Sequence, residues 1–287
     1  MKQSLTLDSL TSCLPPRQRE SYKGNYGRIL VIAGAAGMGG AAILATSAAV
    51  YSGAGLVTAA TAACHHGALH SRVPEAMATT WEDLCAGGAQ DGLISAVDTI
   101  LIGPGLSHSS AARNIFIEVL QHVRPQQTLV IDASALGLWK QLGLPPISAQ
   151  VVITPHMGEW SALTNQPLSA INDGQIYDWL QRHLPQGILV LKSHQTTIYT
   201  IGQEGLLAHP LGIGNPGMAV GGMGDCLAGM IAGLVYQSRS VKDGVCLAVY
   251  LHSYIGDLIA EQEHIVLPHR LIERIPQTMR ELFSPEA

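Results

Sequence analysis

The chain carries five short apolar runs that each end at a polar or glycine-rich turn. Runs of this length, apolar at every position rather than at alternate ones, are typical of strands buried on both faces of a sheet. Segments with helical spacing lie between several of them, which predicts an α/β fold with a mostly parallel sheet covered by helices on both faces. The runs are Arg28–Ala33, Thr99–Ile102, Thr128–Ile131, Val151–Ile153 and Ile188–Leu191, with a sixth strand expected at Leu56–Ala60; helices are expected near Gly40–Tyr51, Ala111–Val123, Cys226–Tyr236 and Val245–Ile259.

The turns that follow these strands are the expected place for chemistry. In parallel α/β sheets, ligands bind beyond the carboxyl ends of the strands. The sequence shows no internal repeat and no long linker. We therefore predict a single domain over residues 1–287, with residues 1–22 as an amino-terminal lead-in.

Charge and composition exclude several classes of function. The net charge is −5, so no clustered basic face for nucleic acid is expected. The stretch Ile29–Gly67 has no charged residue and is long enough for a membrane helix, but glycines such as Gly34 and Gly53 interrupt it and it is rich in alanine, serine and threonine. We read it as strand, helix and strand, and predict no membrane association.

The cysteines and the amino terminus indicate a reducing compartment. Five cysteines are scattered along the chain without a C-x-x-C pair, so neither a zinc knuckle nor a disulfide framework is expected. The first twenty residues carry charged side chains, among them Asp8 and Arg17, and have no apolar core of a signal peptide. We therefore expect a cytoplasmic protein.

A glycine-rich turn follows the first strand. Gly37–Ala42 matches the dinucleotide pattern G-x-G-x-x-A, but a dinucleotide-binding unit also needs an acidic residue about 20 positions later. No acidic residue lies between Glu20 and Glu75, and the phosphate-binding loop G-x-x-x-x-G-K-[ST] does not occur. An ordinary NAD-dependent dehydrogenase is thus disfavoured. The turn serves either close packing or the close approach of a ligand to the backbone.

The segment Gly214–Asp225 is the most informative one. Several glycines precede a helix, where free backbone N–H groups and the helix dipole favour an anion. Asp225 at the helix start is either an N-cap or a catalytic carboxylate. We interpret the segment as a phosphate site in which Asp225 takes a proton from a hydroxyl group that is being phosphorylated.

Three further strand ends carry candidate side chains. Lys192–Thr196 could hold phosphate oxygens, or could form a plain hairpin with a solvated lysine. His156 follows a proline that restricts the chain, and is either a binding residue or a capping or packing histidine. Asp132 either caps the next helix or binds a ligand or metal, and the sequence does not decide between these roles.

Together these segments resemble the ADP/ATP-dependent NAD(P)H-hydrate dehydratases of the ribokinase-like superfamily. The resemblance covers most of the chain, and its motifs occur in the family's order. They are KGNYG from Lys23, the GGAAI helix start, SGAGLVT from Ser52, IGPGL from Ile102, DASAL, TPHMGEW, LKSHQT, NPGMAVGGMGDCLAGM and AVYLH ending at His252.

The resemblance implies a single-domain, ribokinase-like three-layer sandwich and a repair activity. The family acts on reduced nicotinamide dinucleotides hydrated at C6, (6S)-NADHX and (6S)-NADPHX. ADP or ATP phosphorylates the C6 hydroxyl, and elimination of phosphate restores NADH or NADPH. The alternatives are a small-molecule kinase of the same superfamily, such as a vitamin-precursor kinase, and a non-catalytic nucleotide-binding protein.

The resemblance also assigns roles to individual residues. Asp225 is implied as the catalytic residue, and Gly222, Met223 and Gly224 as the anion hole. Residues implied to bind NAD(P)HX are Ala41, Gly105, His156 and Asp225, and those implied to bind the adenine nucleotide are Lys192, Ser193, His194, Gln195, Thr196 and Gly224. Mg²⁺ is implied at the phosphates, although its protein ligands are not identified.

Assembly and partners also follow from the resemblance. A homotetramer is implied, as is functional pairing with a separate NAD(P)HX epimerase, because the lead-in before Lys23 is too short for an epimerase domain. Two positions depart from the family pattern. Ser193 stands where a glycine is usual, which would cost roughly 1 kcal/mol if the backbone there needs a positive φ, and Ser134 stands where a second aspartate is frequent.

Overall fold

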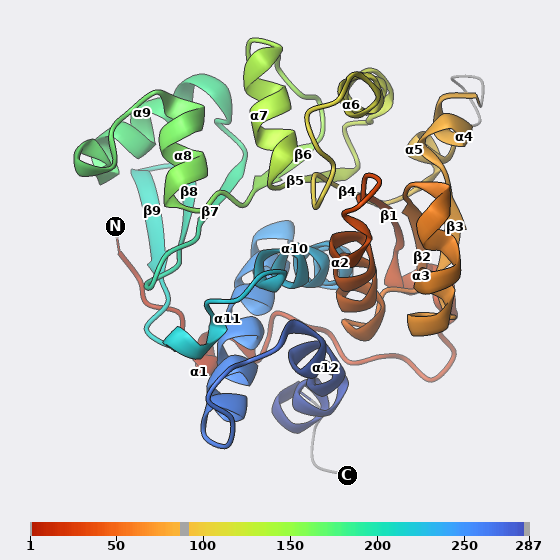
Figure 1. Cartoon of the computed structure of the whole chain (residues 1–287). Helices are drawn as coiled ribbons and strands as arrows, with labels where there is room; N and C mark the ends of the chain where they lie inside the picture. The colour runs from red at the N-terminus through yellow and green to blue at the C-terminus, as the bar shows by residue number, and fades with distance from the viewer. Residues whose placement is uncertain (1, 87–91, 284–287) are drawn as a thin grey trace.

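The computed structural model describes residues 2–86 and 92–283, and within them nine strands form one sheet in the order β3-β2-β1-β4-β5-β6-β7-β8-β9 (Figure 1). Neighbouring strands from β3 to β7 are parallel, whereas β7, β8 and β9 pair antiparallel at one edge. The strands are β1 (Arg28–Ile32), β2 (Leu56–Ala60), β3 (Met77–Thr79), β4 (Thr99–Ile102), β5 (Thr128–Ile131), β6 (Gln150–Ile153), β7 (Ile188–Leu191), β8 (Thr197–Gly202) and β9 (Gly205–Pro210).

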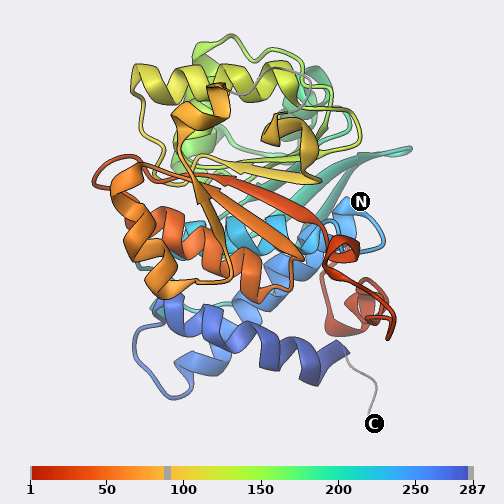
Figure 2. The same ribbon diagram turned by 90° about the vertical axis from the view of Figure 1, so that its right-hand side faces the viewer.

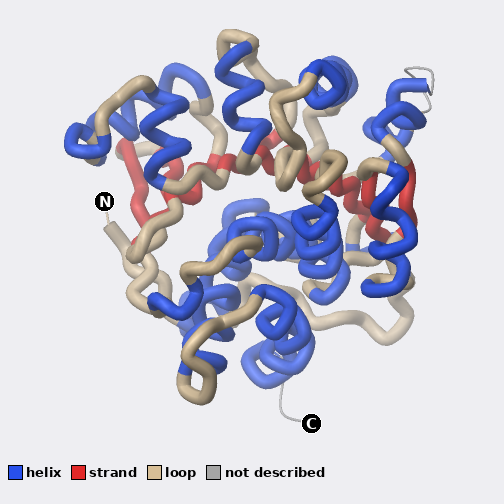
Figure 3. Tube along the Cα trace, viewed as in Figure 1, coloured by secondary structure: helices blue, strands red, loops and turns tan. Residues whose placement is uncertain are grey.

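Helices cover both faces of the sheet, giving three layers (Figures 2 and 3). One apolar core lies between the sheet and α2, α10, α11 and α12, and the other lies between the sheet and α4 to α9. The helices are α1 (Leu7–Leu10), α2 (Gly39–Tyr51), α3 (His66–Arg72), α4 (Trp81–Ala86), α5 (Leu93–Ala96), α6 (Ser110–His122), α7 (Ser134–Gln141), α8 (Met157–Thr164), α9 (Asp173–His183), α10 (Met223–Leu234), α11 (Val241–Ala260) and α12 (Pro268–Phe283).

The central strands are apolar at most positions because their two sides face different cores. In β1, Val31 points into the core beneath α2 and α10, whereas Leu30 and Ile32 point into the opposite core. All three side chains are fully buried. The prediction of a mostly parallel sheet with two helical layers is confirmed, and the uncharged stretch from Ile29 onward is β1, α2 and β2.

Close packing of α2 against α10 brings the amino termini of both helices to the carboxyl edge of the sheet. A Cβ atom on Gly229 would lie 2.2 Å from the carbonyl oxygen of Ala45, and one on Gly233 would lie 2.7 Å from that of Ala49. Only glycine permits backbones to approach so closely. The first turn of α10 is thereby held beside the first turn of α2.

Several parts of the architecture differ from the sequence prediction. The α10 helix begins at Met223 and α11 at Val241, three and four residues before their expected starts, and the strands β3, β8 and β9 were not expected. Among the described residues no helix is long and apolar enough to cross a membrane. The four cysteines whose side chains are described, Cys13, Cys64, Cys226 and Cys246, are all free thiols.

Candidate active site

The predicted anion hole lies at the amino terminus of α10. Gly222 is the N-cap with φ +89°, a left-handed conformation that favours glycine. The first intrahelical hydrogen bond runs from the Cys226 N–H to the Gly222 carbonyl over 3.0 Å. The N–H groups of Met223, Gly224 and Asp225 precede this bond, in the part of a helix whose donors have no intrahelical acceptors. This geometry suits a phosphoryl group.

Asp225 is the third residue of α10 rather than its N-cap, so the capping alternative for this residue is wrong. Its carboxyl is partly buried at the carboxyl edge of the sheet. Burial raises the pKa of Asp225 to about 6, and the negative charges of Asp132 and Glu159 add to this, while Lys192 opposes it. A carboxyl with this pKa is ionised at neutral pH yet remains a more effective base than an ordinary aspartate.

Lys192 lies beside this helix and is held by two carboxylates. Its Nζ donates a hydrogen bond to Asp132 Oδ1 over 2.9 Å and lies 4.0 Å from Glu159 Oε2. Burial alone would lower the pKa of Lys192, but Asp132, Glu159 and Asp225 outweigh it and raise the pKa. The lysine side chain is 19% exposed, so the alternative of a solvated lysine is wrong, although its backbone does open the turn between β7 and β8.

A cavity of about 850 Å³ opens next to Lys192 and the first turn of α10. Five of the six residues implied to bind the adenine nucleotide line it: Lys192, Ser193, His194, Thr196 and Gly224. Gln195 is not among the lining residues; its N–H donates to Ser193 Oγ over 3.0 Å. Ser193 is not among the residues with positive φ, so the strain considered for this position does not arise.

The far wall of this cavity comes from α11 and the loop before α10. Ile213, Leu227 and Val249 give it an apolar surface. Asp257 fixes the loop, because its carboxylate accepts from the Gly214 N–H over 3.0 Å and from Asn215 Nδ2 over 2.8 Å. The lining is therefore apolar on one side and polar at the mouth, which is typical of nucleotide pockets.

His252, in the cavity wall, contacts the first residue of α10. Burial lowers the pKa of His252 to about 4, so the ring is neutral at pH 7. Its Nε2 lies 3.2 Å from the Met223 carbonyl oxygen, an acceptor, so the proton resides on Nε2. In the sequence, His252 stood out only as the last residue of a motif, and no role was predicted for it.

His156 has the capping role that the sequence left open, at the edge of the same cavity. Its Nδ1 accepts from the N–H groups of Gly158 at 3.0 Å and Glu159 at 3.2 Å, and Glu159 Oε2 accepts from the His156 N–H at 2.8 Å. Because Nδ1 accepts, Nε2 carries a proton. This Nε2 lies 3.6 Å from Glu159 Oε2, and with 60% of the side chain exposed a ligand can also reach it.

Ala41 and Gly105 lie together on the other side of the catalytic helix. The turns after β1 and β4 are tied by hydrogen bonds from Gly34 N to Pro104 O at 2.9 Å and from Ala35 N to Gly105 O at 2.7 Å. A Cβ atom on Gly105 would lie 2.9 Å from the Ala41 Cβ. Neither residue lines the 850 Å³ cavity, so the predicted positions form two groups with α10 between them.

The sequence analysis left the role of Asp132 undecided and predicted no role for Glu159, although both are charged residues of the site. Asp132 is 1% exposed and accepts hydrogen bonds from Lys192 and from Thr154 Oγ1, the latter over 2.7 Å. It therefore neither caps α7 nor stands free for a ligand at that oxygen. Glu159 was quoted within a motif without a role. Among the described residues, no group of three or more side chains could hold a metal ion.

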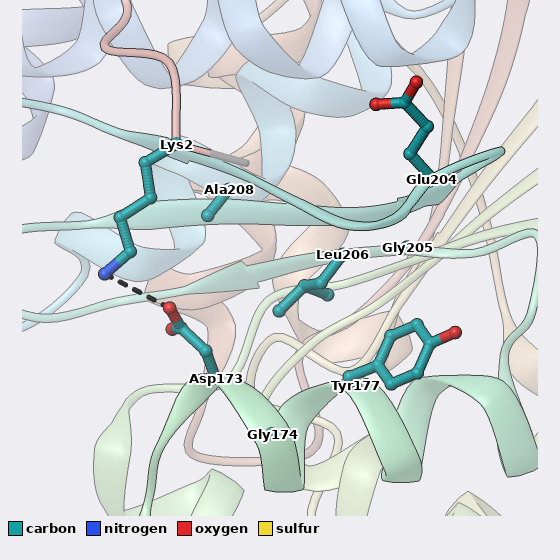
Figure 4. A pocket seen from close by; sticks show the side chains of 8 residues that line it. All are labelled: Lys2, Asp173, Gly174, Tyr177, Glu204, Gly205, Leu206 and Ala208. Carbon is teal, nitrogen blue, oxygen red and sulfur yellow. Dashed lines mark ion pairs between the residues drawn. The ribbon is translucent and has the colours of Figure 1, made fainter.

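Another hollow lies away from these strand ends, between α9 and the β8–β9 hairpin (Figure 4). It measures about 430 Å³ and contains an exposed ion pair, with Lys2 Nζ 3.1 Å from Asp173 Oδ2. None of the predicted site residues lines it. The strand-end cleft is thus the better candidate for chemistry.

The chain is similar to known proteins over nearly its whole length. Residues 29–277 match the profile of the NAD(P)H-hydrate dehydratase family. An ADP-dependent (S)-NAD(P)H-hydrate dehydratase of Staphylococcus aureus is 39% identical over 98% of this chain and 99% of the relative. A ribokinase-like superfamily protein of Enterococcus faecalis superposes with TM-score 0.91 at 38% identity, covering 99% of this chain and 97% of the other. The ADP/ATP-dependent NAD(P)H-hydrate dehydratase of Bacillus subtilis, co-crystallised with ATP and Mg²⁺, gives TM-score 0.83 at 28% identity, covering 97% and 98%.

Proposed function

The chain belongs to the NAD(P)H-hydrate dehydratase family, and from this premise we propose that it restores NADH and NADPH from (6S)-NADHX and (6S)-NADPHX, with ADP or ATP as phosphoryl donor. The observation that carries the proposal is the position of Asp225. It lies in the first turn of α10, among free N–H groups, and has a pKa raised to about 6. A nucleotide-sized cavity opens beside it.

The reaction divides into a transfer and an elimination. Asp225 accepts the proton of the C6 hydroxyl while that oxygen attacks the terminal phosphoryl of the nucleotide. A C6–O–P bond forms as the bond between the terminal phosphoryl and the rest of the nucleotide breaks, so that ADP leaves as AMP, or ATP as ADP. The ring nitrogen then expels phosphate from C6, and loss of the C5 proton restores the double bond. Because phosphate is a much better leaving group than hydroxide, the transfer makes the dehydration feasible.

The remaining predicted residues have roles in binding and charge stabilisation. The N–H groups of Gly222, Met223 and Gly224 stabilise the transferred phosphoryl, as an oxyanion hole does. The nucleotide occupies the 850 Å³ cavity against residues 192–196. The hydrated dinucleotide lies on the other side of α10 against Ala41 and Gly105, and the ring Nε2–H of His156 donates a hydrogen bond to it.

Mg²⁺ is proposed to enter with the nucleotide and to neutralise its phosphates. Mg²⁺ keeps several waters and often relies on one or two protein carboxylates plus substrate phosphates, so a complete protein cage is not required. Chelation with EDTA should therefore abolish turnover, and added Mg²⁺ should restore it.

The proposed setting is a homotetramer in the cytoplasm, where the nicotinamide dinucleotides are used, acting on small molecules and not on nucleic acid or membranes. The name of the S. aureus relative specifies the S hydrate. A stereospecific enzyme leaves the R epimer untouched, so a separate epimerase would complete the repair. Light scattering of the purified protein measures the oligomeric state directly.

The activity is tested by supplying both hydrates with ADP and with ATP in turn. The expected result is NADH or NADPH, followed by absorbance, together with free phosphate and AMP or ADP in equal amounts. Formation of a stable phosphorylated vitamin precursor, with no NADH recovered, would instead favour the kinase alternative. Omitting the nucleotide is the control, and should stop the reaction.

A further inference from the structure

We infer that Asp132 is a positioning residue for this reaction: it holds the Lys192 ammonium group beside the first turn of α10 and keeps it from pairing directly with Asp225. Lys192 is then available to the transferring phosphoryl, and Asp225 stays free to accept the proton. The inference rests on the proposed function, since it concerns how the same site transfers a phosphoryl group.

Asp132 is held by a buried hydrogen bond and by close packing of the backbone around it. Thr154 Oγ1 donates to its Oδ1 over 2.7 Å, and the side chain is 1% exposed. A Cβ atom on Gly103 would lie 1.8 Å from the Asp132 carbonyl oxygen, so β4 approaches it as only a glycine allows. The next residue, Ala133, has φ +47° and ψ −125°, which an alanine rarely adopts and which the surrounding structure must impose.

Stability alone does not explain this buried pair. Asp132 and Lys192 form an ion pair in which the carboxylate is almost wholly removed from water. Desolvation of such pairs commonly cancels their Coulomb attraction, so they contribute little net stability compared with apolar residues of similar size. A pair of this kind is better explained by the place where it puts the charge.

The ion pair places the Lys192 ammonium group where the cavity meets the first turn of α10, which is where the proposed reaction transfers the phosphoryl. A Cβ atom on Gly224 would lie 3.3 Å from Lys192 Nζ, so the ammonium group contacts the first turn of α10. It lines the same cavity as His156 and the nucleotide-facing turn. A fixed cation at this point stabilises negative charge that develops on the transferring phosphoryl.

Four charges face one another here: Asp132, Glu159, Lys192 and Asp225. Lys192 favours the ionised form of Asp225, whereas Asp132 and Glu159 oppose it. With Asp132 neutral, Glu159 at 4.0 Å is the carboxylate that still holds Lys192, and the ammonium group is freer to approach Asp225, whose charge it also feels. Direct pairing would lower the pKa of Asp225 and weaken it as a base.

The test is a double-mutant cycle on kcat with Asp132→Asn, Lys192→Met and the two combined. Asp132→Asn should lower kcat by about ten-fold or more while KM for ADP changes by less than about three-fold, because the lost step is proton and phosphoryl transfer and not nucleotide binding. In the Lys192→Met background the same change should have little further effect, since Asp132 acts through Lys192. Independent, additive losses would overturn the inference.

The pH profile separates a positioning role from a merely structural one. The acid limb of kcat/KM should move to lower pH in Asp132→Asn and to higher pH in Lys192→Met. Glu118→Gln removes one carboxylate from α6, where Glu118 pairs with His122, and is the control that leaves both kcat and the acid limb unchanged. An unshifted acid limb in Asp132→Asn would also overturn the inference.

Failure to fold and failure of the proposed function are both distinguishable. If Asp132→Asn alone is unstable, the variant that combines Asp132→Asn with Lys192→Met still leaves no unpaired lysine. Comparing kcat of this double variant with kcat of Lys192→Met then measures the effect of Asp132. The wild-type protein is assayed on NADHX and ADP alongside. Absent wild-type turnover contradicts the proposed function, whereas normal wild-type turnover with an additive cycle contradicts only the role of Asp132.

Discussion

At the scale of single residues, Asp225 governs the expected chemistry. Asp225→Asn keeps the size of the side chain but removes the base, so turnover should fall by roughly 10²-fold or more while nucleotide binding is kept. Steady-state kinetics and calorimetric titration with ADP measure the two quantities separately. Unchanged turnover would remove Asp225 from the mechanism, and lost binding would point to a structural role.

The same substitution should stabilise the protein at alkaline pH. The pKa of the folded carboxyl, about 6, lies above the ordinary aspartate value of 3.8. Folding is therefore favoured most below pH 3.8, and this contribution is lost as the pH rises through 6. The shift of about two pH units corresponds to at most about 3 kcal/mol.

Asparagine does not ionise and avoids that loss. At pH 8 we expect Asp225→Asn to unfold at a higher denaturant concentration than the wild type, with the difference narrowing towards pH 4. Chemical denaturation at both pH values measures the free energy of unfolding. A variant less stable than the wild type at pH 8 would contradict the raised pKa.

At the residue level, local sequence patterns predicted where side chains lie in the fold. The glycines before Asp225 place that carboxylate at a helix start, and strand ends place Lys192 and His156 at the same edge. The partners of Lys192 could not be predicted, because Asp132 and Glu159 come from different strand ends and meet it only in the folded chain. Likewise, the sequence could not tell that Ser193 adopts a backbone any residue allows.

At the scale of elements, the contact of α2 with α10 sets the position of the anion hole. Gly229→Val would place methyl groups where a Cβ alone lies 2.2 Å from the Ala45 carbonyl oxygen. Forcing these helices apart should destabilise the protein by about 3 kcal/mol or more, and should lower turnover because the first turn of α10 moves. Thermal unfolding and the NADHX assay measure both effects.

A glycine in an open position supplies the matched control. A Cβ on Gly67 in α3 would have no neighbour within 4 Å, and its φ is not positive. Gly67→Ala should therefore leave turnover unchanged and raise stability slightly, by about 0.4–1 kcal/mol. Equal losses in Gly67→Ala and Gly229→Val would mean that close helix packing is not the cause.

Prediction of the elements followed burial. Strands covered on both faces are apolar throughout, so β1, β2, β4, β5, β6 and β7 were placed within about one residue at each end. The β8–β9 hairpin at the sheet edge was missed because its partly exposed strands lack a continuous apolar run. The start of α10 was placed three residues late because glycines that disfavour a helix begin it at the anion site.

At the scale of the whole molecule, α10 separates the 850 Å³ cavity from the group around Ala41 and Gly105. The cavity draws its walls from the β7–β8 turn, the loop before α10, and α11. The group around Ala41 and Gly105 is formed by the turns after β1 and β4. Both sites are built on the same sheet and the same helical layer. Nucleotide binding should therefore stabilise the whole chain against unfolding, and not one part of it.

We therefore expect ADP to raise the unfolding temperature of the whole chain in a single transition. A ligand at one hundred times its Kd adds about 2.7 kcal/mol, which for a chain of 287 residues corresponds to a shift of roughly 4–5 °C. Ala219→Trp, which places a large ring at the exposed mouth of the cavity, should abolish the shift. Asp173→Asn, in the separate hollow near the amino terminus, should retain it. An ADP shift that survives Ala219→Trp but is lost in Asp173→Asn would place the nucleotide in that hollow instead.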